Sequence, residues 1–228
     1  SEGERYTYRK IVDAMIPNLS AALPMAGDVD GDGLSDIMVR TMNAAATEGR
    51  VRIYLDDPAG GTLNAEDMIH ERVLSCVEPQ VSYICWTLWD MNGDGREDLV
   101  GIDYDGGFEA HIVDIASGTT TSTKDFLPGA GTTTYRKSIA IADLCGDGPC
   151  LIYRAGTRYN EKKWIVALND TLGEIGRHEI AATNDLSDPA FSHFIEVADI
   201  DADGRDEGIL GSWIIECDDT GNFSPYAK

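Results

Sequence analysis

Basic residues are scarce in this sequence, and their scarcity limits the partners that the chain can bind. Lysine and arginine together number 18, against 40 aspartates and glutamates, so the formal net charge is −22 at pH 7. A surface this acidic repels phosphate backbones and anionic membrane surfaces. Runs of about 18 apolar residues, which a membrane-spanning helix needs, are also absent. We therefore expect no nucleic acid among the partners and no insertion into a membrane.

Common catalytic signatures are missing as well. The sequence has no nucleophile elbow, no HExxH segment and no phosphate-binding glycine loop. The four histidines are scattered along the chain, and we expect none of them to be catalytic. The four tryptophans lie in or beside strand-like runs. They are expected to fill the core rather than to form a platform for sugars.

Cysteine is infrequent, with five in 228 residues, and neither a CxxC motif nor a cysteine–histidine spacing typical of a metal site occurs. Cys76 and Cys85 flank one turn, and Cys145 and Cys150 flank another, which leaves Cys217 over. We expect a disulfide within each local pair. Such bonds persist in oxidising compartments, so the chain is expected to be secreted and extracellular.

The start of the chain and three asparagines fit the same expectation. No initiator methionine and no signal-like apolar segment stand at Ser1, which predicts a processed product or an excised domain. Asn18, Asn169 and Asn222 each begin an Asn-x-Ser/Thr triplet, the acceptor pattern for N-glycosylation in a eukaryotic source. These residues are therefore candidate sites of a glycoprotein.

What the sequence does contain is an acidic loop that occurs four times. The first copy reads Asp28-Val-Asp30-Gly-Asp32-Gly-Leu-Ser-Asp36, with acidic side chains at positions 1, 3, 5 and 9 and a glycine at position 6. Ca²⁺ takes about six to eight oxygen ligands. Four carboxylates, the backbone carbonyl of Leu34 and a water would supply that number, so the loop predicts a calcium site.

The other copies begin at Asp90, Asp143 and Asp199, at intervals of roughly 55 residues. Each copy follows a short strand-like run and precedes an apolar one. Self-similarity at this period is typical of propellers and solenoids. The predicted fold class is all-β, a single domain over residues 1–228 that forms a closed four-bladed β-propeller.

The predicted blades span residues 20–78, 79–129, 130–183 and 184–221. The last blade lacks a strand, and we expect the N-terminal strand at 5–16 to fill that place and close the ring. A linear solenoid and an incomplete part of a larger propeller are the alternatives.

The D-x-D-G-D-G-x-x-D frame, followed by an apolar strand, resembles the FG-GAP or VCBS repeat of integrin-α-type β-propellers. The resemblance covers nearly the whole chain and implies about three bound Ca²⁺ ions that stabilise the blades. Carried over position by position, the implied ligands are Asp28, Asp30, Asp32, Leu34 and Asp36; Asp90, Asn92, Asp94, Arg96 and Asp98; and Asp199, Asp201, Asp203, Arg205 and Glu207, with the position-7 residues offering backbone carbonyls. An EF-hand is excluded because position 12 is Val39, Gly101 or Leu210 instead of glutamate.

The third copy departs from the pattern. Cys145 stands at position 3 and Leu151 at position 9, so two side-chain ligands are missing. Cys150 lies in the same turn, close enough for a bridge to Cys145. We expect that disulfide to hold the loop in place of a metal ion.

A second, weaker resemblance concerns residues 25–33 and 198–212, which look similar to the calcium-lined blades of rhamnogalacturonan lyases. Those enzymes have a larger ring and extra loops across a substrate groove, so the likeness implies shared repeat ancestry without shared activity. The expected function is a non-catalytic module for recognition, adhesion or extracellular structure. Its expected partners are a protein or carbohydrate ligand, or further copies of itself in a fibre or matrix. The alternative is a carbohydrate-binding or polysaccharide-degrading, lyase-like propeller, in which carboxylates away from the metal loops act as acid and base.

Overall fold

A computed structural model describes residues 11–12, 23–42, 49–55, 63–64, 68–74, 86–104, 108–125, 139–156, 163–180, 195–210, 213–218 and 221–227. Every regular element in these ranges is a β-strand. The strands are β1 (Ile11–Val12), β2 (Leu23–Gly27), β3 (Asp36–Met42), β4 (Gly49–Tyr54), β5 (Leu63–Asn64), β6 (Met68–Leu74), β7 (Trp86–Trp89), β8 (Asp98–Tyr104), β9 (Phe108–Asp114), β10 (Thr119–Asp125), β11 (Ile139–Ala142), β12 (Cys150–Gly156), β13 (Lys163–Leu168), β14 (Glu174–Ile180), β15 (Glu196–Ala198), β16 (Glu207–Leu210), β17 (Trp213–Ile215) and β18 (Tyr226–Ala227). No helix long and apolar enough to cross a bilayer occurs in the part of the chain that the structure describes.

Sixteen of these strands form four antiparallel sheets of four strands each. Sheet 1 has the order β2-β3-β4-β6, sheet 2 runs from β7 to β10, sheet 3 from β11 to β14, and sheet 4 from β15 to β18. In each sheet an acidic loop joins the first strand to the second. We number these loops with their sheets: loop 1 (residues 28–36), loop 2 (90–98), loop 3 (143–151) and loop 4 (199–207).

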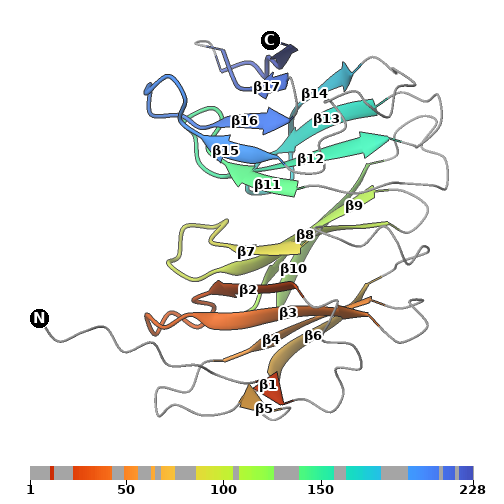
Figure 1. The fold of residues 1–228 in the computed structure, drawn as a ribbon, viewed down its shortest axis with the longest axis vertical. Coiled ribbons are helices and arrows are strands. Elements are labelled where there is room, and N and C mark those ends of the chain that lie inside the picture. Colours follow the sequence, from red (N-terminus) through yellow and green to blue (C-terminus); the bar gives the residue numbers. More distant parts are fainter. Residues whose placement is uncertain are drawn as a thin grey trace, which may run out of the picture.

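The sheets follow one another in a row, from sheet 1 at the bottom of Figure 1 to sheets 3 and 4 at the top. Each contact between neighbours is an apolar core. Met38 and Ile53 of sheet 1 meet Leu99 of sheet 2, whereas Val100, on the other face of the same strand, packs against sheet 3. A third cluster joins sheets 3 and 4. Inner strands are thus buried on both faces, which explains their nearly continuous apolar sequences.

The burial of the residue at position 2 of each acidic loop agrees with this order of the sheets. Val29, Met91 and Leu144 are each 1% exposed, and each packs in the core between its own sheet and the next one. Ile200, the equivalent residue of loop 4, is 49% exposed. Among the described residues, sheet 4 is therefore the end of the row.

The expected closed four-bladed propeller is wrong. β1 does not complete sheet 4 but pairs in parallel with β5 in a separate two-stranded sheet. The fourth strand of sheet 4 is instead β18, from the C-terminal segment. Sheets 1 and 4 lie at opposite ends of the row, and no apolar cluster of the described residues joins them. The repeat was visible in the sequence, but which segment pairs with the last edge strand depends on tertiary contacts.

Candidate metal-binding loops and functional site

Loop 1 is shaped by its own acidic side chains. Asp28 accepts hydrogen bonds from the amides of Gly31 and Gly33 at 2.7 and 2.9 Å. Asp30 and Asp32 each accept one from the amide two residues further on, at 3.1 and 2.8 Å. Gly31 and Gly33 have φ of 80° and 85°, a left-handed conformation that favours glycine. The side chains at positions 1, 3 and 5 thereby hold the backbone of the loop in a series of tight turns.

The same pattern recurs in loops 2 and 4. Asp90 accepts the amides of Gly93 and Gly95, and Asp199 accepts that of Gly204. In loops 1 and 4, oxygens of the carboxylates at positions 1, 3 and 5 lie within 4.8 Å of one another, so each group can hold a metal ion. Loop 2 has Asn92 at position 3, whose Oδ1 faces the amide of Asp94 at 2.9 Å. Convergent carboxylate and amide oxygens are the donors that a hard cation such as Ca²⁺ prefers.

The carboxylates at position 9 are buried and have a different hydrogen-bond partner from those at positions 1, 3 and 5. Asp36, Asp98 and Glu207 are only 2%, 3% and 4% exposed. Each accepts a hydrogen bond from the amide at position 2 of its own loop, at 2.9, 3.0 and 2.6 Å. Burial raises the pKa of Asp36 and of Asp98 to about 6. At least one oxygen of each is thus bonded to backbone, and metal ligation by these residues stays a prediction.

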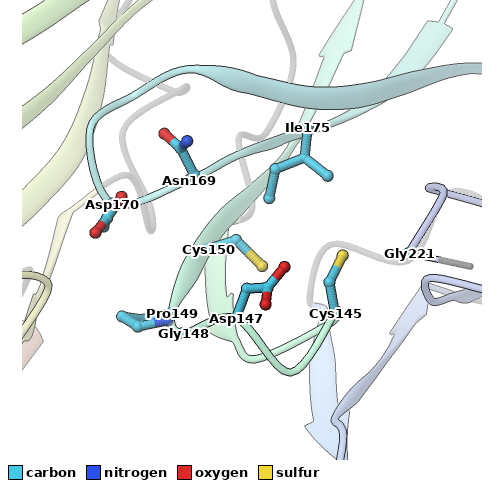
Figure 2. Close-up of a pocket in the computed structure, with 9 residues that line it drawn as sticks. All are labelled: Cys145, Asp147, Gly148, Pro149, Cys150, Asn169, Asp170, Ile175 and Gly221. Atoms are coloured by element: carbon cyan, nitrogen blue, oxygen red, sulfur yellow. The ribbon is translucent and has the colours of Figure 1, made fainter.

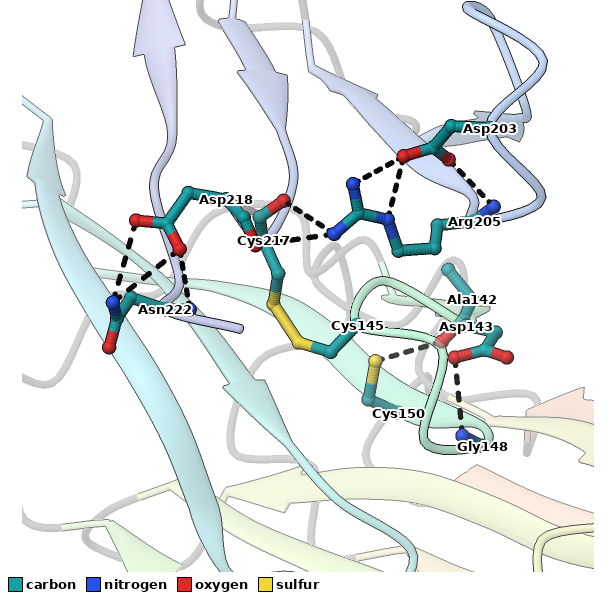
Figure 3. The surroundings of a disulfide bond; sticks show 10 residues. All are labelled: Ala142, Asp143, Cys145, Gly148, Cys150, Asp203, Arg205, Cys217, Asp218 and Asn222. Carbon is teal, nitrogen blue, oxygen red and sulfur yellow. Dashed lines mark hydrogen bonds and ion pairs between the residues drawn. A yellow bond between two sulfur atoms is a disulfide. The ribbon is translucent and has the colours of Figure 1, made fainter. Parts of the chain in front are cut away.

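In loop 3 the expected pairing of Cys145 with Cys150 is wrong. Cys145 is bonded to Cys217, 72 residues away, across a Cα–Cα distance of 5.1 Å (Figure 3). Cys150 is a free, buried cysteine, and burial raises the pKa of its thiol to about 11. The disulfide therefore ties loop 3 to the segment after β17 and joins sheet 3 to sheet 4. Cys76 and Cys85 lie outside the described residues.

The strand register explains the role of Cys150. The residue before each loop pairs with position 9 in loops 1, 2 and 4, for example Gly27 with Asp36. In loop 3, Ala142 pairs with Cys150 at position 8. Loop 3 is thus one residue shorter than its sequence alignment suggests. Cys150, and not Leu151, takes the place of the carboxylate, and its Sγ donates to the carbonyl of Ala142 at 2.8 Å.

The loops associate in pairs through positions 7 and 8 of the even-numbered loops. The amide of Glu97 in loop 2 donates to the carbonyl of Asp28 at 2.8 Å, and the Arg96 side chain lies against Gly31. In loop 4, Asp206 makes the equivalent backbone bond to Asp143 at 2.9 Å. The sequence assigned only a carbonyl to Arg96 and Arg205, and it assigned nothing to Glu97.

Glu97 differs from Asp206 in its side chain. Asp206 Oδ2 accepts the amide of Asp143 at 2.9 Å. Glu97 Oε2 is fully buried, and it has no hydrogen-bond partner among the described residues. Burial raises the pKa of Glu97, and the carboxylates of Asp28, Asp90 and Asp36 raise it further. An orphaned oxygen among acidic groups fits a bound cation.

A cavity of about 210 Å³ opens beside loop 3 (Figure 2). Its lining includes the polar side chains of Asp147, Asp170 and Asn169, together with Cys145 and Cys150. The Asn169 Oδ1 accepts the amide of Gly173 at 2.7 Å, so this side chain holds a turn. Asn222 is exposed. Glycosylation of both stays a prediction, and Asn18 lies outside the described residues.

A basic and aromatic cluster between sheets 1 and 2 was not found from the sequence. The Arg72 guanidinium lies 4.9 Å from the Trp86 ring centre, and the His111 ring stacks on Trp86 at 5.6 Å. Gly101 stands between Trp86 and His111 in the sheet and leaves room for the stack. The three residues of the cluster, Arg72, Trp86 and His111, come from three different strands. Only the pairing of strands and sheets therefore reveals the cluster. Trp89, by contrast, is 46% exposed and directly precedes loop 2.

Comparison with known proteins gives two curated relatives, and no protein-family model matches the chain. The chain is 28% identical over 206 residues to the rhamnogalacturonan exolyase YesX of Bacillus subtilis, and 23% identical over 265 residues to the rhamnogalacturonan endolyase YesW of the same organism. These alignments cover 88% and 98% of this chain but only 29% and 41% of the relatives. The chain therefore spans less than half the length of either enzyme.

Solved structures show the same likeness. The structure of the lyase YesW superposes with a TM-score of 0.68 and 18% identity, covering 90% of this chain and 42% of that one. A rhamnogalacturonan lyase of Bacillus licheniformis superposes with a TM-score of 0.64 and 19% identity, covering 86% of this chain and 40% of that one. The fold of the chain is thus found within rhamnogalacturonan lyases.

These comparisons correct the main sequence-based interpretation. The resemblance to FG-GAP or VCBS repeats gains no support, whereas the weaker resemblance to rhamnogalacturonan lyases is supported. The expectation of a non-catalytic adhesion module, and of a protein that is not an enzyme, is contradicted because the matched proteins degrade a polysaccharide. The alternative reading, a lyase-like protein, is the better one.

Proposed function

We propose that this chain forms part of a secreted, calcium-stabilised polysaccharide lyase that acts on rhamnogalacturonan or a related acidic polysaccharide. The observation that carries the proposal is the likeness to two rhamnogalacturonan lyases over 88% and 98% of the chain. The partner is then a carbohydrate substrate. Assembly with further copies of the chain gains no support.

Three loops would hold the metal: loop 1, loop 2 and loop 4. Their ligands would be the oxygens at positions 1, 3 and 5, which already converge in loops 1 and 4. Bound Ca²⁺ would supply positive charge that neutralises these carboxylates and fixes the turns that join the first two strands of each sheet. The chain's own residues shape the turns, because Asp28, Asp90 and Asp199 each accept backbone amides.

Charge makes the metal relevant to the substrate. The galacturonate units of the polysaccharide are anionic, as is this chain, whose net charge is −22. Like charges repel, so close approach of the substrate requires local positive charge. Three Ca²⁺ ions would lie on the loop edge of the sheets, and the exposed Trp89 ring beside loop 2 offers an apolar face of the kind that stacks on sugars.

The test is an assay of the chain with rhamnogalacturonan in millimolar Ca²⁺. A lyase breaks the glycosidic bond by elimination, which leaves a carbon–carbon double bond that absorbs ultraviolet light. We expect the chain to bind the oligosaccharide in a calcium-dependent way and to release ultraviolet-absorbing products. A neutral polysaccharide such as dextran is the control. Absence of both cleavage and binding, with the loops loaded with calcium, would overturn the proposal.

A further inference from the structure

Glu97 belongs to loop 2, but its side chain lies against loop 1. Its amide donates to the carbonyl of Asp28 at 2.8 Å, which fixes its backbone beside position 1 of that loop. A Cβ atom added to Gly27 would lie 1.6 Å from Glu97 Oε2. Only glycine at position 27 therefore leaves space for the carboxylate where it is. Gly27 and Glu97 are far apart in the sequence, and together they allow an acidic side chain of loop 2 to reach loop 1.

The place that Glu97 reaches is unfavourable for a carboxylate in the absence of a cation. Its Oε2 is buried without a hydrogen-bond partner among the described residues. The carboxylates of Asp28, Asp90 and Asp36 act on it, and all three are negative. Burying a charge is costly unless an opposite charge or a hydrogen bond compensates it.

The second pair of loops provides an internal comparison. Asp206 of loop 4 occupies the equivalent position beside loop 3, and its carboxylate is bonded to the amide of Asp143. Loop 3 has cysteine at position 3, and it lacks the carboxylate that loops 1, 2 and 4 have at position 9. Asp206, which lies beside the degenerate loop 3, thus has a hydrogen bond from the protein to its side chain. In the described structure, Oε2 of Glu97, which lies beside the intact loop 1, has no such bond.

We propose that the carboxylate of Glu97 binds the cation held by loop 1, so that loop 2 completes the loop-1 site. Occupation of that site then ties sheet 1 to sheet 2 as well as ordering loop 1. The shared ligand makes the contact between the two sheets dependent on calcium. This inference rests on the calcium site proposed for loop 1, and it does not depend on lyase activity.

The test compares Glu97→Gln with Asp206→Asn, its matched counterpart in loop 4. Calcium affinity is measured by calorimetric titration after removal of metal, and thermal unfolding is followed in chelator and in millimolar Ca²⁺. For Glu97→Gln we expect the affinity of one site to fall by about tenfold or more, because a charged ligand is lost. We also expect the melting temperature to rise in chelator and the calcium-induced increase to shrink.

Asp206→Asn should leave every calcium affinity unchanged and lower the melting temperature equally in both conditions. Gly27→Ala is the second variant, because its methyl group displaces the Glu97 carboxylate without removing the charge. It should weaken the same site. Unchanged calcium affinities in Glu97→Gln, or an equal loss of melting temperature with and without calcium, would overturn the proposal. Circular dichroism establishes that each variant is folded.

Discussion

At the scale of single residues, buried charge in sheet 1 is compensated by a neighbour on the next strand. Arg52 is 2% exposed, and its Nε donates to Glu71 at 2.7 Å. Arg50 donates to the other oxygen of the same carboxylate at 2.8 Å. Two guanidinium groups thus share one acid across the pairing of β4 with β6. Only the Arg52 end of this network is buried, and solvent screening reduces the contribution of the exposed Arg50–Glu71 pair.

This arrangement predicts a specific dependence of stability on pH. Hydrogen bonds from Arg52 and Arg50 hold the pKa of Glu71 below its usual value of 4.5. The stabilisation is therefore complete above about pH 4.5 and is lost as the pH falls through the lower, folded-state pKa. We expect Glu71→Gln to lower the free energy of unfolding at pH 7 but to lower it much less at an acidic pH well below 4.5. Denaturant unfolding at both values, compared with the wild type, measures this difference.

An equal effect of Glu71→Gln at both pH values would show that the loss comes from packing and not from charge. Glu174→Gln is a suitable control, since Arg177 lowers the pKa of Glu174 in a similar way on an exposed edge. Salt screens exposed pairs, so this control should have a small effect at physiological ionic strength.

Cys150 gives a second prediction at this scale. Its thiol is buried, its pKa is raised from 9.0 to about 11, and it donates to the carbonyl of Ala142. Because thiolate is the reactive form, alkylation at pH 8 should be about a hundredfold slower than for an exposed thiol. Mass spectrometry of the alkylated protein locates the label, and denaturant should restore rapid reaction. Rapid labelling of Cys150 in the native chain, or of Cys145 without reductant, would contradict the structure.

At the scale of elements, the acidic loop is the unit that the sequence predicts well. The spacing of Asp28, Asp30 and Asp32 indicated a turn with convergent carboxylates, and the structure brings their oxygens together. The prediction of the turn succeeds because the interactions are local. The side chains at positions 1, 3 and 5 accept hydrogen bonds from backbone amides only a few residues away. The sequence also indicated short strands before and after each loop.

Features that depend on pairing between distant segments were not accessible in this way. The one-residue shortening of loop 3 appears only in the register of β11 with β12. The bond between Cys145 and Cys217 joins segments 72 residues apart, whereas the expected bond to Cys150 was the nearest in sequence. The contact of Glu97 with loop 1 and the cluster of Arg72, Trp86 and His111 likewise require two strands or two sheets to meet.

The loops predict a difference between intact and degenerate copies. Asp30→Asn in loop 1 and Asp201→Asn in loop 4 each remove a charged ligand at position 3, so each should weaken one calcium site by about tenfold. Asp147→Asn in loop 3 is the matched control at position 5, and we expect no change in calcium affinity. Titration with Tb³⁺, followed by its luminescence, measures all three variants. Weakening by Asp147→Asn would mean that loop 3 also binds metal.

At the scale of the whole molecule, the row of sheets and the excess of acids act together. Forty acidic residues against 18 basic ones produce self-repulsion, which destabilises the compact state. Among the described residues, the large apolar cores join each sheet to its neighbours in the row, so the repulsion between loops on one edge is opposed mainly by the cores between adjacent sheets. Specific cations on that edge should therefore stabilise the chain more than general screening does.

We expect Ca²⁺ to raise the melting temperature by about 5 to 10 °C for each site held at a hundredfold excess over its dissociation constant. Sodium chloride at the same ionic strength should produce a much smaller rise, since it only screens the charges. Mg²⁺ should also be less effective, because it retains its waters and demands octahedral geometry. Differential scanning calorimetry with these three salts, after chelation, makes the measurement. Equal effects of all three would argue against specific sites.

The two outer junctions of the row are fastened by different chemistry. Sheets 1 and 2 meet at loops 1 and 2, whose carboxylates are intact, whereas sheets 3 and 4 are joined by the Cys145–Cys217 bond. By our proposal one fastening depends on the concentration of free calcium, whereas the other depends on an oxidising redox potential. Inside a cell, where calcium is scarce and thiols are kept reduced, neither would hold. The chain would reach its full rigidity only where free calcium is abundant and thiols are oxidised.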